Sequence, residues 1–378
     1  MTLDLDSLTS SLLYGWIRSE SPPNRAFTPF YIPVTNIVKA DVVLRPEFSK
    51  VLGYANLTTD HLITLDNLHS KNGELELLEP KQTKWVLVDH NALQGPLSKR
   101  YAHRVGGVID HHQEENQVPE DTGCEPRIVE IAGSCTSLVT NYVREAWTKL
   151  SSASHGNDST EWDAQVAKMA LASILIDTVN LEDLSKVTKH DQDAVQFLEA
   201  KVLEHPKTAK TYNRQKLYEE ISKAKQDIDR LRVTDILRRD YKEWTENGKK
   251  LGISSVVKPL DFLLSKSEQE MDLSEVEAFS ILVGEFCEQR HLDLYAVMTA
   301  FSDDNKEFRR ELFLRSANHS SSHMAEKFER DAKDELGLTV WEGGKLAERP
   351  GDWQRAWNQD QMQHSRKQVA PLLREAMR

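Results

Sequence analysis

The residues with the clearest capacity for chemistry are Asp110, His111 and His112, which directly follow the apolar pair Val108-Ile109. An apolar β-branched run is typical of a buried parallel strand, and open α/β sheets bind ligands at the carboxyl ends of such strands. Neighbouring side chains on a strand point to opposite faces, so we predict different roles for the two histidines. One could hold a metal ion while the other meets a substrate.

The same arrangement recurs elsewhere in the first half of the chain. An apolar strand pattern from Trp85 ends in Asp89, an apolar run ends in Asp177, and Asp4 and Asp6 precede a helix pattern. Carboxylates mixed with imidazoles suit Mn²⁺, Mg²⁺ or a similar ion better than a thiolate-type zinc site. A single motif of this kind would favour an ordinary turn or helix cap. Four of them together indicate a metal site.

The elements that must position these groups are those of an α/β domain. Helix patterns cover residues 7–18, 45–54, 138–150, 164–176 and 188–202, and strand patterns cover 84–89, 106–111 and 127–131. The polar residues 151–160 indicate a surface loop. Residues 133–137 open a helix with Ser and Thr, which favours a plain cap over a phosphate contact at the helix start.

A domain boundary is expected near Glu204-His205-Pro206-Lys207, which gives domains 1–205 and 206–378. In the second, residues 212–231, 273–287, 321–331 and 367–377 predict helices. Residues 251–258 predict a strand that ends in lysine, and residues 292–301 and 308–314 alternate like antiparallel strands. The basic run at residues 237–242 indicates a solvated helix face.

Composition narrows the class of protein. The 378 residues include 39% hydrophobic and 29% charged residues, and the net charge of −12 argues against nucleic acid as the main partner. No apolar run reaches 18 residues and no signal segment is visible, so no membrane association is expected. Cys124, Cys135 and Cys287 form neither a metal spacing nor a disulfide framework, which favours a reducing, cytoplasmic location.

These motifs resemble those of a known superfamily. Asp4-x-Asp6-Ser7, Asp89-His90-Asn91, Asp110-His111-His112 and Asp177 are similar to the four motifs of the DHH phosphoesterases. Ser365-Arg366-Lys367-Gln368-Val369 resembles the C-terminal signature of the DHHA2 branch, which contains manganese-dependent inorganic pyrophosphatases, exopolyphosphatases and prune-type phosphohydrolases. The resemblance implies a parallel-sheet DHH domain, a smaller α+β DHHA2 domain and an active site in the cleft between them.

The resemblance also implies roles for individual residues. Two divalent ions, Mn²⁺ or Mg²⁺, would share Asp89 as a bridge. Asp4 would hold the first ion, and the second would be held by Asp6, His111 and Asp177. His112 would face the substrate phosphate, and Asp110 would orient an imidazole without touching the metal itself. His90 could support a metal ligand in the same way or be structural. The phosphate chain would be bound by Lys258, Arg366 and Lys367.

The function implied is hydrolysis of phosphoanhydride bonds, with inorganic polyphosphate preferred as substrate. A manganese-dependent pyrophosphatase is the nearest alternative, and a weakly active, prune-like interaction protein is another. In this superfamily a His or Asn stands four residues before the first aspartate, at the end of an apolar strand. Met1 lies three residues before Asp4, so we expect that strand and ligand to be missing and the activity of this chain to be weakened.

Overall fold

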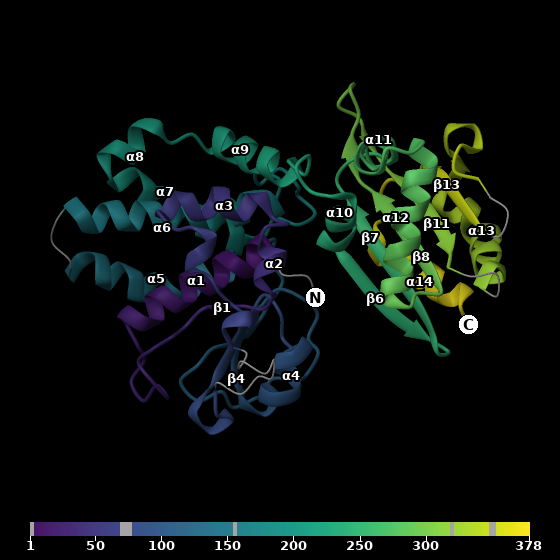
Figure 1. Cartoon of the computed structure of the whole chain (residues 1–378). Helices are drawn as coiled ribbons and strands as arrows, with labels where there is room; N and C mark the ends of the chain where they lie inside the picture. The colour runs from purple at the N-terminus through teal and green to yellow at the C-terminus, as the bar shows by residue number, and fades with distance from the viewer. Residues whose placement is uncertain (1–3, 69–77, 154–156, 318–320, 348–352) are drawn as a thin grey trace. The chain divides into compact units, whose positions relative to one another are not determined.

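A computed structural model describes residues 4–68, 78–153, 157–317, 321–347 and 353–378 (Figure 1). The chain divides into two compact units after Asp227. The helices of the first unit are α1 (Leu5–Glu20), α2 (Lys39–Val42), α3 (Pro46–Leu52), α4 (Gly95–Tyr101), α5 (Cys135–Ala153), α6 (Asn157–Asp177), α7 (Lys189–Glu204), α8 (Pro206–Thr211) and α9 (Arg214–Gln226). Its strands are β1 (Val34–Thr35), β2 (Ile63–Thr64), β3 (Trp85–Val88), β4 (Val105–Asp110) and β5 (Arg127–Val129).

The sheet that carries the predicted site is parallel, as expected. Strands β3, β4 and β5 lie side by side in that order, and β1 pairs with β2 in a separate parallel ribbon. Every residue of β4 is buried. Because the strands run in one direction, Val88 pairs with Ile109, and the acids that follow β3 and end β4 meet at the same edge of the sheet.

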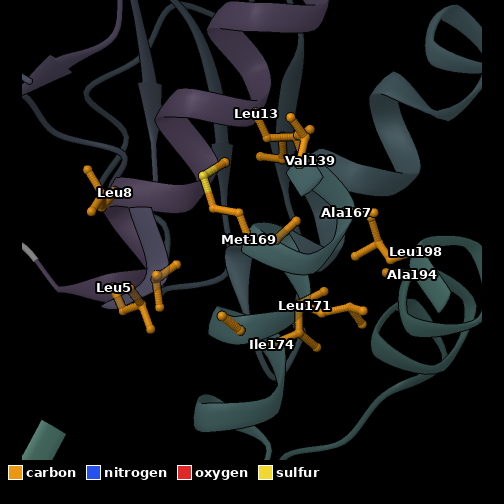
Figure 2. Close-up of a cluster of buried hydrophobic side chains, with 14 of the residues drawn as sticks. Leu5, Leu8, Leu13, Val139, Ala167, Met169, Leu171, Ile174, Ala194 and Leu198 are labelled. Carbon is orange, nitrogen blue, oxygen red and sulfur yellow. The ribbon is translucent and has the colours of Figure 1, made fainter. Parts of the chain in front are cut away.

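Both faces of this sheet are covered, which explains the uninterrupted apolar run in β4. Ile109 belongs to a large core built with α1, α5, α6 and α7, whose buried side chains Figure 2 shows packed together. Val108 points to the opposite face, where it joins Leu97 and Tyr101 of α4. A strand with helices on both faces needs no polar alternation.

The first unit ends later than the boundary expected at residue 205. Leu217 and Ile221 of α9 are buried in its core, and Glu220 pairs with Lys50 of α3 at 3.1 Å. The proline that resembled a linker residue, Pro206, is the first residue of α8. Proline is favoured at that position because its missing N–H has no partner in the first helical turn.

The second unit is built on one mixed sheet. Its strands are β6 (Tyr241–Glu246), β7 (Lys249–Val256), β8 (Leu294–Thr299), β9 (Phe301–Ser302), β10 (Phe308–Arg309), β11 (Glu311–Ser316), β12 (Leu338–Val340) and β13 (Gln354–Gln359). The main sheet has the order β12-β13-β11-β8-β7-β6, in which β7 and β8 are parallel, and β9 pairs with β10 in a hairpin. The helices are α10 (Val233–Arg239), α11 (Leu260–Met271), α12 (Glu275–Arg290), α13 (Ser322–Leu336) and α14 (Arg366–Ala376).

Side chains of β8 alternate between two cores. Tyr295 and Val297 pack with α10, α11 and α12, while Leu294, Ala296 and Met298 pack with α13 and α14. The antiparallel pairing of β8 with β11 confirms the strand prediction. None of the described helices is long and apolar enough to cross a membrane.

Two local predictions were wrong. The polar stretch at residues 151–160 is helical at 151–153 and 157–160, with 154–156 outside the described residues. Its polar groups are satisfied between helices, since Lys201 of α7 donates to Ser151 at 3.0 Å and to Asp163 at 3.2 Å. The basic run at residues 237–242 is split, because α10 ends at Arg239 and Lys242 lies on β6. An edge strand tolerates such charges because one side of it is unpaired.

Candidate metal centre

Asp89 follows β3 in a left-handed backbone conformation, with φ of 63°. Aspartate tolerates this region better than most residues, and the Asp89 N–H still donates to Ile109 O at 3.0 Å. The carboxylate is 3% exposed. Oδ2 accepts a hydrogen bond from Ser7, whereas the one described group near Oδ1 is the His111 ring, whose Nε2 lies 3.2 Å away. The turn therefore aims a buried, incompletely satisfied carboxylate at the carboxyl edge of the sheet.

Asp110, the last residue of β4, organises the histidines that follow it. Its Oδ1 accepts the backbone N–H of His111 at 2.8 Å and lies 2.8 Å from His112 Nδ1, and its Oδ2 accepts from Asn91 at 2.6 Å. Burial would raise the pKa of Asp110, but these donors lower it below its ordinary value. Asp110 thus fixes the ring of His112 with Nδ1 protonated, which leaves Nε2 for another partner.

His111 and His112 lie beyond the last strand residue, so strand alternation does not separate them. Their ring centroids are 4.5 Å apart. They differ instead in their hydrogen bonds, because His111 Nδ1 lies 2.9 Å from Ala132 O and its Nε2 lies 3.2 Å from Asp89 Oδ1. The two roles predicted for them rested on the wrong geometric reason, although their surroundings are distinct.

The protonation of His111 and Asp89 reflects their proximity. Burial would lower the pKa of His111, but the hydrogen bond with Asp89 and the charge of Asp6 raise it to about 10. Burial, followed by the charge of Asp6, raises the pKa of Asp89 to about 7. Without a metal ion, a proton on His111 Nε2 occupies the place that a divalent cation would take between these side chains.

Asp6 connects this centre to the start of α5. Its Oδ1 accepts hydrogen bonds from four groups of the helix start and α6: Ser134 Oγ at 2.7 Å, Thr136 N at 2.9 Å, Thr136 Oγ1 at 2.7 Å and Ser173 Oγ at 2.9 Å. Among the described residues, its Oδ2 accepts a hydrogen bond from Cys135 N alone, at 2.6 Å, and lies 3.8 Å from His111 Nε2. Oδ2 is therefore the oxygen of Asp6 that remains for a metal ion.

The start of α5 also binds a second internal acid. Asp191, which is fully buried, accepts from Gly133 N at 2.9 Å, Ser134 N at 3.2 Å and Ser137 Oγ at 2.7 Å. The hydrogen-bond donors at the start of α5 are thus bound to two carboxylates of the protein, Asp6 and Asp191. A plain cap was the favoured prediction here. A phosphate at this helix start would have to compete with these carboxylates for the same donors.

Asp4 and Asp177 complete the set of acids. Asp4 caps α1 and accepts from Ser7 N at 3.1 Å, and the same serine donates to Asp89. Asp177 is the last residue of α6, where the helix dipole disfavours an anion. Burial, then the charges of Asp6 and Asp4, raise the pKa of Asp177 well above its ordinary value. Its buried Oδ2 has no hydrogen-bond partner among the described residues.

Asp4, Asp6, Asp89 and Asp177, called the acidic cluster below, fit a divalent cation. Asp89 and Asp177 each have one buried oxygen without a good hydrogen bond from the described residues, and burial and the charges of Asp6 and Asp4 raise the pKa of both. Asp89, His111 and His112 can each offer one ligand atom, all within 4.8 Å of one another. Carboxylates held together in this way need a compensating positive charge.

Several polar residues of this centre were not predicted from the sequence. Ser7, Ser173 and Asn91 donate to the acids, and Asp191 supports the helix that Asp6 caps. The motifs contained Ser7 and Asn91, but nothing in a single sequence connects Ser173 or Asp191 with Asp6, because their contacts join distant segments. His90 Nδ1 donates to Val88 O at 2.8 Å, and burial lowers the pKa of His90, which suits a structural role.

The predicted phosphate-binding residues all lie in the second unit. Arg366 Nη2 pairs with Asp240 Oδ1 at 2.8 Å, and Lys258 Nζ lies 3.7 Å from Asp229 Oδ1. Lys367 is exposed and has no ion pair within the described part of the chain. The three cations are therefore present on the surface of one unit, two of them beside a carboxylate.

Comparisons with known proteins identify the family. The family model for the N-terminal domain of the DHH family matches residues 1–174, and the DHHA2 domain model matches residues 219–376. A Schizosaccharomyces pombe protein provisionally named an exopolyphosphatase is 30% identical over 382 residues, covering 99% of this chain and 88% of the relative. The chain belongs to the DHH family. The resemblance proposed from the motifs, including the DHHA2 branch, is confirmed.

Further relatives agree with this DHH–DHHA2 assignment. Exopolyphosphatase PRUNE1 of Homo sapiens is 27% identical over 380 residues, covering 99% of this chain and 73% of the relative. A solved structure from Methanococcus jannaschii, provisionally assigned as a family II inorganic pyrophosphatase, superimposes with a TM-score of 0.54 at 21% identity. It covers 99% of this chain and 96% of its own, which confirms the predicted fold.

Proposed function

We propose that this DHH protein hydrolyses phosphoanhydride bonds and releases orthophosphate from the end of inorganic polyphosphate. The observation that carries the proposal is the acidic cluster beside His111, where buried carboxylate oxygens lack donors. The names of the S. pombe and human relatives support polyphosphate as the substrate. A polyphosphate end presents several anionic oxygens, which an acidic cluster alone would repel.

Divalent ions, Mn²⁺ or Mg²⁺, would resolve that repulsion. Asp89 would bridge two ions, with Asp4 on the first and with Asp6, His111 and Asp177 on the second. His111 suits this role because its Nδ1 is held by Ala132 O, leaving Nε2 as a ligand atom. When bound, such ions lower the pKa of water towards neutrality and offset charge on phosphoryl oxygens.

His112 is the protein group best placed to act on the substrate directly. Its side chain is 45% exposed, while Asp110 holds its Nδ1 at 2.8 Å. That hydrogen bond raises the pKa of His112, which favours the protonated ring near neutral pH. Nε2 can then donate to a phosphoryl oxygen and stabilise charge that develops on it. Asp110 acts through His112 as a positioning residue.

Cations of the DHHA2 domain would bind the rest of the phosphate chain. Lys258, Arg366 and Lys367 would supply positive charge to phosphate groups of the substrate. Guanidinium forks match phosphate oxygens, and ammonium groups add point charges. Replacing Arg366 by Ala should therefore weaken substrate binding without changing metal stoichiometry, at a cost of roughly 1.5–3 kcal/mol for a lost charge-assisted contact.

The deciding experiment compares phosphate release from long polyphosphate, tripolyphosphate and pyrophosphate, each with Mn²⁺ and with Mg²⁺. We expect polyphosphate and tripolyphosphate to be hydrolysed, and Asp89→Asn to abolish turnover and lower bound metal measured by elemental analysis. Preference for pyrophosphate would assign the chain as a pyrophosphatase instead. Full metal binding without hydrolysis of any of the three would favour a weakly active interaction protein.

A further inference from the structure

Two cations open α14, the last helix of the DHHA2 domain. Ser365 caps this helix by accepting from Lys367 N at 3.3 Å, and Gln368 accepts in return from Ser365 N at 3.0 Å. Arg366 and Lys367 are therefore the first two helical residues. The positive end of the helix dipole disfavours cations at these positions. Their placement is favourable only when an anion lies against them.

One protein anion already contacts Arg366. Its Nη1 donates to the backbone carbonyl of Asp240 at 2.9 Å, and its Nη2 donates to the Asp240 carboxylate at 2.8 Å. A guanidinium has five N–H donors, so Asp240 leaves the Nε–H and one hydrogen on each terminal nitrogen available. The Arg366 side chain is 17% exposed, so its orientation decides what those donors can reach.

Asp240 is itself held by the sheet. It lies between the last residue of α10 and the first residue of β6, and its carbonyl also accepts from Ser255 N of β7 at 2.9 Å. The acid therefore joins Arg366 to the central part of the domain through a backbone atom that cannot move independently. Because these hydrogen bonds already hold the guanidinium in one orientation, it loses less conformational entropy when it binds an anion.

We propose that Asp240 is a positioning residue, which holds the Arg366 guanidinium so that its remaining N–H groups bind a phosphoryl group of the polyphosphate chain. This inference rests on the proposed function and adds a residue to it. It also predicts the direction in which substrate binding changes when Asp240 loses its charge. If Asp240 merely competed with phosphate for Arg366, removing its charge would tighten substrate binding, whereas loss of a positioning contact weakens it.

The domain offers a matched control for this contact. Glu246, the last residue of β6, binds Arg374 further along α14, with 2.6 Å between Oε1 and the Arg374 Nε. Glu246→Gln therefore removes the ion pairs that β6 makes with Arg374 of α14 and with Arg378 beyond it, without touching Arg366. A general loosening of α14 would affect both variants, and a specific effect on Arg366 would affect only Asp240→Asn.

The test measures kcat and KM for tripolyphosphate with Mn²⁺ on the full chain. We expect Asp240→Asn to raise KM about tenfold with a smaller change in kcat, because a contact made equally in the ground and transition states affects mainly KM. Asp240→Glu should restore part of the affinity, and Glu246→Gln should keep the wild-type KM. In an Arg366→Lys background, Asp240→Asn should add little, since it acts through the guanidinium.

A second measurement does not depend on turnover. Nitrogen-15 NMR of arginine side chains should show restricted guanidinium rotation for Arg366 in the wild type and in Glu246→Gln, and averaged signals in Asp240→Asn. A lower KM in Asp240→Asn, or equal KM changes in Asp240→Asn and Glu246→Gln, would overturn the proposal. Absence of hydrolysis by the wild type would refute the proposed function alone, and calorimetric binding of tripolyphosphate would then replace KM.

Discussion

Metal binding to the acidic cluster should release protons, and the raised pKa values of its side chains indicate how many. A metal ion needs the deprotonated Asp89 carboxylate and the bare Nε2 of His111. Without metal these groups lie 3.2 Å apart and share protons, with pKa values raised to about 7 for Asp89 and about 10 for His111. Both pKa values lie at or above neutral pH, so both groups carry protons that a cation must displace.

The number of protons released follows from the pKa values of Asp89 and His111. At pH 7, Asp89 is half protonated and His111 is protonated, so these two groups should release about one to one and a half protons, and Asp177, whose pKa is also raised, can only add to that number. Because the slope of log affinity against pH equals the number of protons released, Mn²⁺ affinity should rise about 10- to 30-fold per pH unit near pH 7. One unit of pKa shift corresponds to about 1.4 kcal/mol of preference for the protonated form.

Calorimetry measures the number of protons released directly. Mn²⁺ is titrated into the metal-free protein at pH 7 in two buffers that differ in ionisation enthalpy, and the difference in binding enthalpy yields the protons taken up by the buffer. His111→Gln should lower the release by about one proton. His103→Gln, which changes an exposed imidazole, should leave it unaltered. Equal enthalpies in both buffers for the wild type would refute the reasoning.

Three further results are expected. Without metal, stability should fall by roughly 6 kcal/mol from pH 5 to pH 9, because the raised pKa values of Asp89 and His111 mean that stability present at low pH is lost as each proton leaves, and Asp177 adds to the loss. Thermal melts with and without Mn²⁺ measure this, and a flat metal-free profile would contradict it. Asp191→Ala should cost roughly 2–4 kcal/mol by orphaning donors at the start of α5, yet leave metal stoichiometry intact in the folded protein. Gly107→Ala should cost about 1–3 kcal/mol, because its Cβ would lie 2.8 Å from that of Glu125, whereas Gly53→Ala meets open space and serves as the control.

Predictions from the sequence succeeded where local pattern and chemistry agree. The apolar run in β4 and its acidic end were readable because a strand covered on both faces has no polar positions. Helices α1, α3, α5, α6 and α7 and strands β3, β4 and β5 followed from the same periodicities, whereas the short elements α2, α4, β1 and β2 were not predicted. The two histidines were also assigned different surroundings, but for a wrong reason, since β4 ends at Asp110 and alternation stops there.

What the sequence did not reveal depends on contacts between distant segments. The partners of Asp6, such as Ser173, come from helices that no local pattern connects with the N-terminus. The division after Asp227 was missed because α9 looks like a solvated charged helix, while Leu217 and Ile221 reach the first core. Asp240 looked like part of a basic helix face until β6 was seen to begin beside it.

The shared start of α5 has a consequence for how the first unit assembles. Its opening turn is completed by Asp6, about 130 residues upstream, and by Asp191, which arrives with α7. Contacts of such large sequence separation form late, since loop closure must precede them. During synthesis, the last hydrogen-bond partner of Asp6, Ser173, therefore becomes available only when α6 has left the ribosome. The acidic cluster is therefore completed only when α6, which carries Ser173 and Asp177, has packed against the N-terminal segment.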